Sequence, residues 1–332
     1  MGYSYYESTL TPSERAAYGA FLRGISSSQR SFSAPRLDTE RLGAIFNMMK
    51  LDHPLIFNAQ NLAFTYSEGS TNVTVKPEYS MKKQEYEATL EIIEKRLKKV
   101  LAPAKDLSLP EKERFIHDYI VKCVKYDKLK KQYSHEVTGP LCHGIGVCEG
   151  MAKTFKLMCD EVGIDCLVCT GIGVPPEAAT GKKSERHAWN IVVIDGKALG
   201  VDVTFDNSLS DSFIRYDYYN ISDSIMSYDH GNLTYPVPAC VTAGADYYSE
   251  NGLSFEDESA VLPALRRAAK SPHTVAFRLS VDPDAEKLTD SIKNLMSEEK
   301  RFRRFSKFSY KINHASRVAV LKLELRDFKE VT

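Results

Sequence analysis

The residues of this chain that could do chemistry begin with a cysteine that follows two closely spaced glycines. Residues 144–152 read Gly-Ile-Gly-Val-Cys-Glu-Gly-Met-Ala, which places Cys148 just before an amphipathic run and hence at the start of a predicted helix. The unpaired backbone N–H groups and the positive end of the helix dipole at such a position favour the thiolate, the nucleophilic form of cysteine. The pattern therefore predicts a nucleophilic thiol at residue 148.

Periodicity supports the helix that follows Cys148. Apolar residues recur at spacings of three and four from residue 151 to residue 162, and Gly163 then provides a C-terminal stop signal. A lone cysteine is more often a buried structural thiol than a catalytic one. The catalytic interpretation of Cys148 therefore depends on an imidazole and a carboxylate elsewhere in the chain.

A histidine and an aspartate downstream fall on a predicted β-hairpin. The strand that begins at His187 is rich in β-branched and aromatic residues, Asp195-Gly196 is a two-residue turn signal, and the return strand extends to Asp206. Pairing across this turn makes Trp189 face Asp202, so that His187 and Asp202 are diagonal neighbours on one sheet face. Such neighbours lie about 7–8 Å apart at the backbone, within reach of a hydrogen bond between their side chains.

These three residues can carry out nucleophilic acyl chemistry. His187 would accept the proton of Cys148 or form a thiolate–imidazolium pair with it, and Asp202 would orient the imidazole. The acyl oxyanion needs hydrogen-bond donors, of which the backbone N–H of Cys148 is one. His143 and the indole of Trp189 are the candidates for a second donor or for lining the site. Each also has a structural interpretation, His143 as a surface loop histidine and Trp189 as a core aromatic that shields the site.

The motifs around the three residues resemble the core of the transglutaminase-like superfamily, which is similar to papain-type cysteine peptidases in fold and triad. The resemblance lies in Gly-Val-Cys148-Glu-Gly-Met-Ala, Arg-His187-Ala-Trp-Asn and Val-Asp202-Val-Thr-Phe-Asp. The segments 115–127 and 216–230, the second ending in Asp229-His230, are similar to flanking segments of bacterial members, so the resemblance covers about 110–235. It implies that Cys148 is the nucleophile, His187 the base and Asp202 the orienting acid.

The elements around the triad predict an α+β fold with three parts. A papain-like transglutaminase core at 105–238, in which the helix that bears the nucleophile packs on an antiparallel sheet, follows a mostly helical region with a small hairpin at 1–104. A small α+β domain at 239–332 completes the chain, after the boundary signal Pro-Val-Pro at 236–238. Further elements are predicted by periodicity and turn signals: helices at 11–25, 38–49, 82–101, 111–124 and 283–297, a hairpin at 62–75, and strands at 164–171, 274–281 and within 305–325.

Composition argues against several other classes of protein. Basic and acidic residues balance at 44 each, which argues against a nucleic-acid partner, and no run of about 18 apolar residues predicts a membrane span. Cys166 and Cys169 have the spacing of a metal or redox pair, but residues three apart in a strand point to opposite faces, and no second pair completes a zinc site. We therefore expect no metal and no cofactor. The oligomeric state cannot be predicted from the sequence.

The first residues carry neither a basic nor an apolar leader segment, which predicts a cytoplasmic protein. Relatives of this type are often exported, so an extracellular or cell-surface location follows instead if a leader has been removed.

Three functions are compatible with the triad. The first and favoured one is a cysteine peptidase or amidase that acts on a protein or peptide substrate. The second is a protein-glutamine transglutaminase, in which an amine instead of water resolves the same acyl-enzyme. The third is a binding or scaffolding protein that retains the fold without turnover, and the intact triad argues against it.

Overall fold

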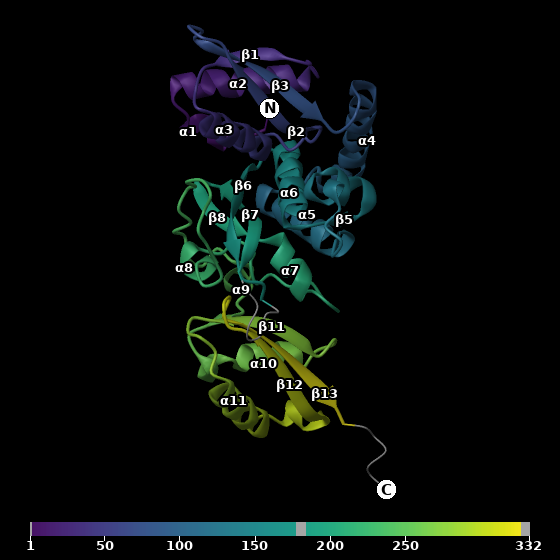
Figure 1. The fold of residues 1–332 in the computed structure, drawn as a ribbon. Coiled ribbons are helices and arrows are strands. Elements are labelled where there is room, and N and C mark those ends of the chain that lie inside the picture. The colour runs from purple at the N-terminus through teal and green to yellow at the C-terminus, as the bar shows by residue number, and fades with distance from the viewer. Residues whose placement is uncertain (1, 177–183, 327–332) are drawn as a thin grey trace.

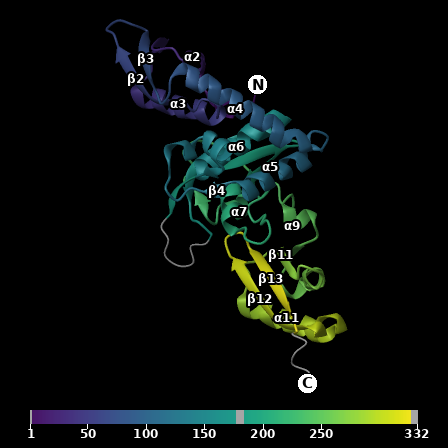
Figure 2. The same cartoon turned by 90° about the vertical axis from the view of Figure 1, so that its right-hand side faces the viewer.

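A computed structural model describes residues 2–176 and 184–326. Three tiers follow one another along the molecule in both ribbon views (Figures 1 and 2). We refer to residues 2–104 as the N-terminal region, to residues 105–238 as the core and to residues 239–326 as the C-terminal region. Each tier has its own sheet, with the strand orders β1-β3-β2, β8-β7-β6-β9 and β10-β11-β13-β12. The mixture of helices and antiparallel sheets is the α+β class that the sequence predicts.

The N-terminal region combines helices with a three-stranded antiparallel sheet. Thr11 and Glu14 form a capping box at the start of its second helix, as the Thr-Pro-Ser-Glu sequence would favour. The elements are α1 (Tyr5–Thr9), α2 (Pro12–Ser26), β1 (Phe32–Pro35), α3 (Thr39–Asp52), β2 (Ala59–Tyr66), β3 (Asn72–Tyr79) and α4 (Lys83–Leu101). The predicted helices and hairpin are confirmed, whereas the short elements α1 and β1 carried no sequence signal that we recognised.

The core places one long helix against an antiparallel sheet. Helix α6 contacts β6 and β7, and Gly163 ends it in the left-handed conformation predicted by its position. The elements are α5 (Leu109–Cys123), β4 (Lys125–Tyr126), β5 (Ile145–Gly146), α6 (Cys148–Val162), β6 (Asp165–Gly173), β7 (Glu185–Ile194), β8 (Lys197–Val201), α7 (Val203–Leu209), α8 (Asp223–Met226) and β9 (His230–Gly231). None of the helices in the described residues combines the length and apolar composition that a membrane span requires.

The predicted hairpin has the expected register but a shorter return strand. Ile194 pairs with Lys197 across the Asp195-Gly196 turn, and the ladder continues without a bulge to Asn190 and Val201. It stops there because α7 begins at Val203, so the predicted strand to Asp206 is wrong. The expected cross-strand pair of Trp189 and Asp202 is therefore absent from the ladder.

The C-terminal region packs two main helices against a four-stranded sheet, as Figure 1 shows. Its elements are α9 (Tyr247–Glu250), β10 (Ser254–Phe255), α10 (Leu262–Ala268), β11 (Thr274–Leu279), α11 (Ala285–Glu298), β12 (Phe305–Asn313) and β13 (Val318–Leu325). The strand, helix and terminal strands predicted for this region are confirmed. Helix α10 and strand β10 were not predicted.

The two faces of the core sheet belong to different hydrophobic clusters. One face, which includes Cys169, shares a cluster with α2 and α3 of the N-terminal region. The other face, which includes Cys166, packs with α5 and α6 and with α4, whose Tyr86, Ile93 and Leu97 belong to the same cluster. The two cysteines thus point to opposite faces, as predicted for positions three apart in a strand. The C-terminal region has a separate apolar cluster of its own.

Candidate active site

Cys148 is the first residue of α6, and the chain before it is tightly fixed. Gly144 adopts the left-handed conformation at φ 65°, and β5 then pairs with β4 before Val147 caps the helix without a side-chain hydrogen bond. The cap leaves the first N–H groups of α6 free to act on an anion at the helix start. Gly150 permits a close approach, because a Cβ atom there would lie 2.2 Å from the carbonyl oxygen of Ser134. The half-buried thiol of Cys148 lines a cavity of about 510 Å³.

His187 lies on β7 and lines the same cavity as Cys148. Its Nε2 atom is 2.6 Å from Oδ2 of Asp202, which leaves Nδ1 for the thiol. The ring stacks on Phe205 at a centroid distance of 4.4 Å, and a Cβ atom at Gly173 would come within 2.9 Å of it. The imidazole is therefore held in one orientation by a carboxylate, an aromatic face and a close backbone.

Asp202 reaches His187 from the N-cap position of α7, not from the predicted strand. Its Oδ1 atom accepts hydrogen bonds from the backbone N–H groups of Thr204 at 2.8 Å and Phe205 at 3.1 Å. Its Oδ2 atom is thereby directed toward His187. The predicted contact between His187 and Asp202 is present in the structure, but helix capping supplies the geometry that we had assigned to strand pairing.

The charges and hydrogen bonds within the triad shift the pKa values of His187 and Asp202. Burial alone would lower the pKa of His187, but the charge and hydrogen bond of Asp202, together with those of Cys148, raise it to about 10. Burial would likewise raise the pKa of Asp202, yet the charges and hydrogen bonds of His187 and His230 hold it well below its usual range. The arrangement therefore favours an imidazolium beside an ionised carboxylate.

His230 is a fourth member of the cluster that we did not select as a site residue. Its Nε2 atom is 3.0 Å from Oδ2 of Asp202, and its Nδ1 atom is 2.6 Å from Oδ1 of Asp229. The only sequence signal was the Asp229-His230 pair at the end of the post-triad segment, which contributed to the resemblance alone. Because strand β9 pairs with β6, a residue 28 positions beyond Asp202 is brought back to it.

His187, Asp202 and His230 could also be considered as metal ligands, since their polar atoms lie within 4.8 Å of one another. Around a tetrahedral zinc ion with bonds of about 2.1 Å, ligand atoms lie roughly 3.4 Å apart. The separation of 2.6 Å between His187 and Asp202 is that of a direct hydrogen bond. The donor set fits a hydrogen-bonded cluster better than a metal centre.

The two candidates for a second oxyanion donor lie in different places. Trp189 is buried, stacks against His187 at a centroid distance of 6.1 Å, and lines a separate cavity behind the triad. His143 is exposed and packs against Tyr133 at 4.5 Å. Neither residue lines the cavity that contains Cys148 and His187. A role for either in binding the oxyanion stays a prediction.

Tyr126 of β4 lies within electrostatic reach of Cys148. Burial raises the pKa of its hydroxyl to about 12, and the charge of Cys148 contributes to the rise. The neighbouring Asp127 fixes the following loop through Ser134, whose hydroxyl donates to it at 2.5 Å. A phenol near the thiol offers an O–H donor that the sequence pattern did not single out.

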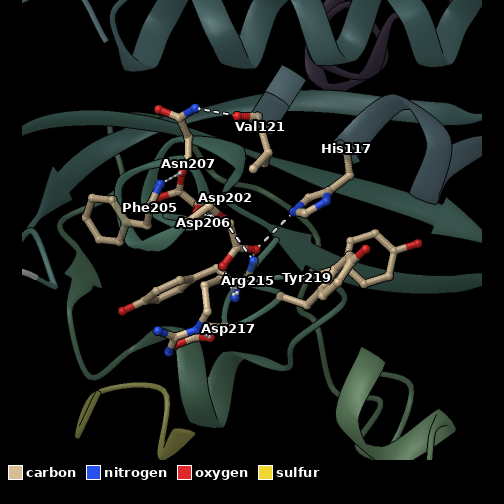
Figure 3. A network of polar contacts seen from close by, with 12 residues as sticks. His117, Val121, Asp202, Phe205, Asp206, Asn207, Arg215, Asp217 and Tyr219 are labelled. Atoms are coloured by element: carbon tan, nitrogen blue, oxygen red, sulfur yellow. Dashed lines mark hydrogen bonds and ion pairs between the residues drawn. The ribbon is translucent and has the colours of Figure 1, made fainter. Parts of the chain in front are cut away.

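Helix α7 is held from its far side by α5, which secures Asp202 indirectly (Figure 3). His117 of α5 lies fully buried, with Nε2 at 3.1 Å from Oδ2 of Asp206 and Nδ1 at 3.2 Å from Asp118. Asn207 donates to the carbonyl oxygen of Val121 at 2.8 Å. These contacts show that α5, which the sequence predicts as a helix at 111–124, packs on the core.

The N-terminal region completes the cavity around Cys148. Helix α3 contributes Asn47, Lys50 and Leu51 to its lining, opposite residues of β6 and β7. Lys50 is 2.9 Å from Glu136, which also binds the buried Lys153 of α6 at 2.7 Å. Ion pairs thus connect the wall of the cavity to the nucleophile helix.

Comparison with known proteins agrees with this geometry. Residues 94–202 match the model of the transglutaminase-like superfamily, a range that includes all three members of the triad. No curated protein matches the chain significantly.

The solved structures that match this chain share little sequence with it. One is a TGase with 13% identity and a TM-score of 0.32, covering 58% of this chain and 55% of the other. A second is a proposed cysteine protease from Cytophaga hutchinsonii, with 13% identity and a TM-score of 0.29, covering 43% of this chain and 61% of the other. A third is a proposed protease from Parabacteroides distasonis, with 15% identity and a TM-score of 0.22, covering 42% and 35%.

The chain spans a little over half the length of the first of these structures, and none of the three carries an argument about activity. The matched range and the arrangement of the three side chains agree with each other. Residues 94–202 of this chain, which contain Cys148, His187 and Asp202, are similar to the transglutaminase-like superfamily.

Proposed function

We propose that the protein catalyses thiol-dependent acyl transfer on peptide or amide bonds, with hydrolysis as the outcome. The observation that carries the proposal is a cysteine at a helix start that shares a cavity with a histidine whose other nitrogen is 2.6 Å from a buried aspartate. A thiol, a base and an orienting acid in this order are the requirements of nucleophilic acyl catalysis.

In the first half-reaction, the thiolate of Cys148 attacks the carbonyl carbon of the scissile amide. The carbonyl oxygen becomes an oxyanion, for which the backbone N–H of Cys148 is a donor. The His187 imidazolium then gives its Nδ1 proton to the departing amine as the C–N bond breaks, leaving a thioester and a neutral imidazole. Asp202 stabilises the imidazolium before this step and retains the ring orientation after it.

In the second half-reaction, the neutral His187 accepts a proton from water as the water oxygen attacks the thioester. The C–S bond breaks, the carboxylic acid is released, and the thiolate–imidazolium pair is restored. Attack by an amine would instead produce the isopeptide product of a transglutaminase. We place hydrolysis first because water needs no acceptor site, whereas an amine does.

Substitution of Cys148 tests the proposal directly. Wild type and Cys148→Ala are compared on casein for peptide release and for incorporation of a labelled amine, with Cys123→Ala, which removes an exposed thiol, as the matched control. We expect peptide release from wild type and the control and none from Cys148→Ala. Amine incorporation instead of release would select the transglutaminase alternative, and the absence of both would favour the non-catalytic scaffold.

Alkylation offers a test that does not depend on the choice of substrate. We expect iodoacetamide to modify Cys148 faster near neutral pH than the other six cysteines, including Cys123, which is more exposed. Equal rates at all seven positions, measured by mass spectrometry of the labelled peptides, would count against an activated thiol.

A further inference from the structure

We infer that His230 is a positioning residue for this reaction: a permanently protonated imidazole that shares the Asp202 carboxylate with His187 and so limits how tightly Asp202 holds the His187 proton. The inference rests on the proposed function, because it concerns the proton that His187 transfers. It assigns a role to a residue that lies behind the triad, away from the cavity that contains Cys148.

The hydrogen-bond partners of His230 determine its protonation state. One ring nitrogen faces Asp202 at 3.0 Å and the other faces Asp229 at 2.6 Å. Asp202 accepts from the Thr204 and Phe205 N–H groups on its other oxygen, and Asp229 accepts from the Tyr218 hydroxyl at 2.5 Å. Ionised carboxylates can only accept, so both nitrogens of His230 must donate. An imidazole that donates from both nitrogens carries a positive charge.

The surroundings of His230 provide no competing partner among the described residues. Its ring contacts Trp189 from β7 at a centroid distance of 4.9 Å and Phe205 from α7 at 4.8 Å, both apolar faces. The titratable groups that face it are Asp202 and Asp229 by hydrogen bond, with the rings of His187 at 5.3 Å and Tyr218 at 5.7 Å. Burial lowers the pKa of His230, but its two carboxylate partners raise it above the ordinary value.

The shared oxygen has a direct consequence for His187. Both imidazoles approach Oδ2 of Asp202, at 2.6 Å from His187 and 3.0 Å from His230. A second cation on this oxygen partly neutralises the charge that would otherwise stabilise the His187 imidazolium. His187 therefore releases its proton to the departing amine more readily than it would if Asp202 bound no second cation, because a general acid works better as its pKa approaches the working pH.

The position of Asp229 is secured by the C-terminal region. The Tyr218 hydroxyl that donates to Asp229 accepts in turn from Nδ2 of Asn313, at 3.2 Å, at the end of β12. This chain of buried contacts fixes Asp229 on the side of His230 opposite Asp202. The His230 ring is therefore held between two carboxylates that cannot readily turn away.

The pH dependence of Cys148 alkylation tests the inference without requiring a known substrate. Wild type, His230→Gln and Asp229→Asn are labelled with iodoacetamide in short pulses from pH 5 to pH 11, and the Cys148 peptide is quantified. The high-pH limb of this profile reports deprotonation of His187 beside the thiolate. His314→Gln, which changes an exposed histidine of the C-terminal region, is the control.

We expect the high-pH limb to move upward by about one pH unit in His230→Gln, because glutamine retains a donor but removes the charge. Asp229→Asn should move it in the same direction by less, because His230 with one carboxylate partner loses its proton at a lower pH, and Asp202 then loses its second cation. Turnover of casein should fall in both variants although Cys148 remains reactive at neutral pH. His314→Gln should behave as wild type.

The outcomes separate this inference from the proposed function. A profile that is unchanged in folded His230→Gln and Asp229→Asn overturns the role of His230, while an activated Cys148 in the same samples leaves the proposed function in place. If wild-type Cys148 reacts no faster than Cys123, the proposed function itself fails. Should His230→Gln not fold, ¹⁵N NMR of the wild-type imidazoles decides: two protonated nitrogens on His230 at pH 8 support the inference, and one overturns it.

Discussion

The two regions that flank the core both combine apolar and polar contacts with it, but they reach different parts of the candidate site. The N-terminal region shares an apolar cluster with one face of the core sheet and contributes Lys50 to the wall of the cavity that contains Cys148. The C-terminal region has its own apolar cluster, against which Phe213 and Tyr216 of the core pack, and it also reaches the core through the buried Asn313 and Ser316, which bind Asp217 at 3.0 and 3.1 Å.

The two regions therefore affect the candidate site in different ways. The N-terminal region completes the cavity with α3, partly through apolar packing, which is non-directional. Its hydrogen bonds to the core, such as that from the Tyr6 hydroxyl to the carbonyl oxygen of Val168, end on β6, α6 and Glu136 and, among the described residues, not on His187 or Asp202. Buried hydrogen bonds are directional and costly to leave unmade, so the C-terminal contacts define the positions of Asp217, Tyr218 and, through them, Asp229. We therefore expect changes on the N-terminal side to affect substrate binding and changes on the C-terminal side to affect the chemical step.

The largest effect is expected at Asp202, which binds both imidazoles and caps α7. Asp202→Asn weakens the acceptor for two imidazoles and the cap of α7, so we expect turnover to fall by roughly a thousandfold or more. Loss of a buried charge partner should also cost about 3 kcal/mol in the free energy of unfolding. Steady-state kinetics and urea unfolding measure the two losses, with Asp211→Asn, an exposed neighbour in sequence, as the control. Near-normal turnover in Asp202→Asn would contradict the role of this carboxylate.

The next effect concerns the support of α7 and depends on pH. Burial alone would lower the pKa of His117, but its hydrogen bonds to Asp118 and Asp206 raise it to about 9. A histidine whose pKa is higher in the folded state contributes stability that is complete below its unfolded pKa of about 6.5 and is lost as the pH rises through 9. We expect the difference in unfolding free energy between wild type and His117→Gln to shrink by on the order of 2 kcal/mol between pH 6 and pH 10. A difference that is constant over this range would show that His117 does not carry the proton in the folded state.

A smaller effect is expected at the wall formed by the N-terminal region. Lys50→Met keeps the apolar stem of the side chain but removes the charge from the cavity, while Glu136 retains Lys153 as a partner. We expect KM on casein to rise by up to about tenfold with kcat nearly unchanged, because the contact is equal in the ground and transition states. Lys76→Met, on the exposed face of β3, is the matched control. A fall in kcat at constant KM would contradict the expectation that the N-terminal side affects substrate binding and not the chemical step.

The smallest effect is expected on the C-terminal side. Asn313→Ala removes a donor to Tyr218 and Asp217, yet Asp217 keeps Arg215 and Ser316 as partners. We expect kcat to fall by a few fold with KM unchanged, and the free energy of unfolding to fall by about 1–2 kcal/mol. Kinetics and urea unfolding of Asn313→Ala beside Asn294→Ala, on helix α11, provide the measurement. A rise in KM instead would place the C-terminal region in substrate binding.

Much of the core could be predicted because its signals are local. The apolar spacing of α6, the left-handed Gly163 at its end and the Asp195-Gly196 turn all act within a few residues. The same reliance on local signals explains why the strand predicted to continue through Asp202 is wrong. A strand that continues and a strand that gives way to a helix differ little in sequence over residues 202–206, where Asp202 serves equally well as a strand residue or an N-cap.

The sequence by itself determined that a thiol starts a helix and that a histidine and an aspartate follow on a hairpin and its continuation, since helix and strand periodicities and turn residues encode these features along the chain. Only the tertiary structure decided that His230 joins Asp202, that Lys50 lines the cavity and that Asn313 reaches Tyr218. These contacts connect residues far apart in the sequence. They depend on how sheets and helices pack in space, which no short pattern of residues specifies.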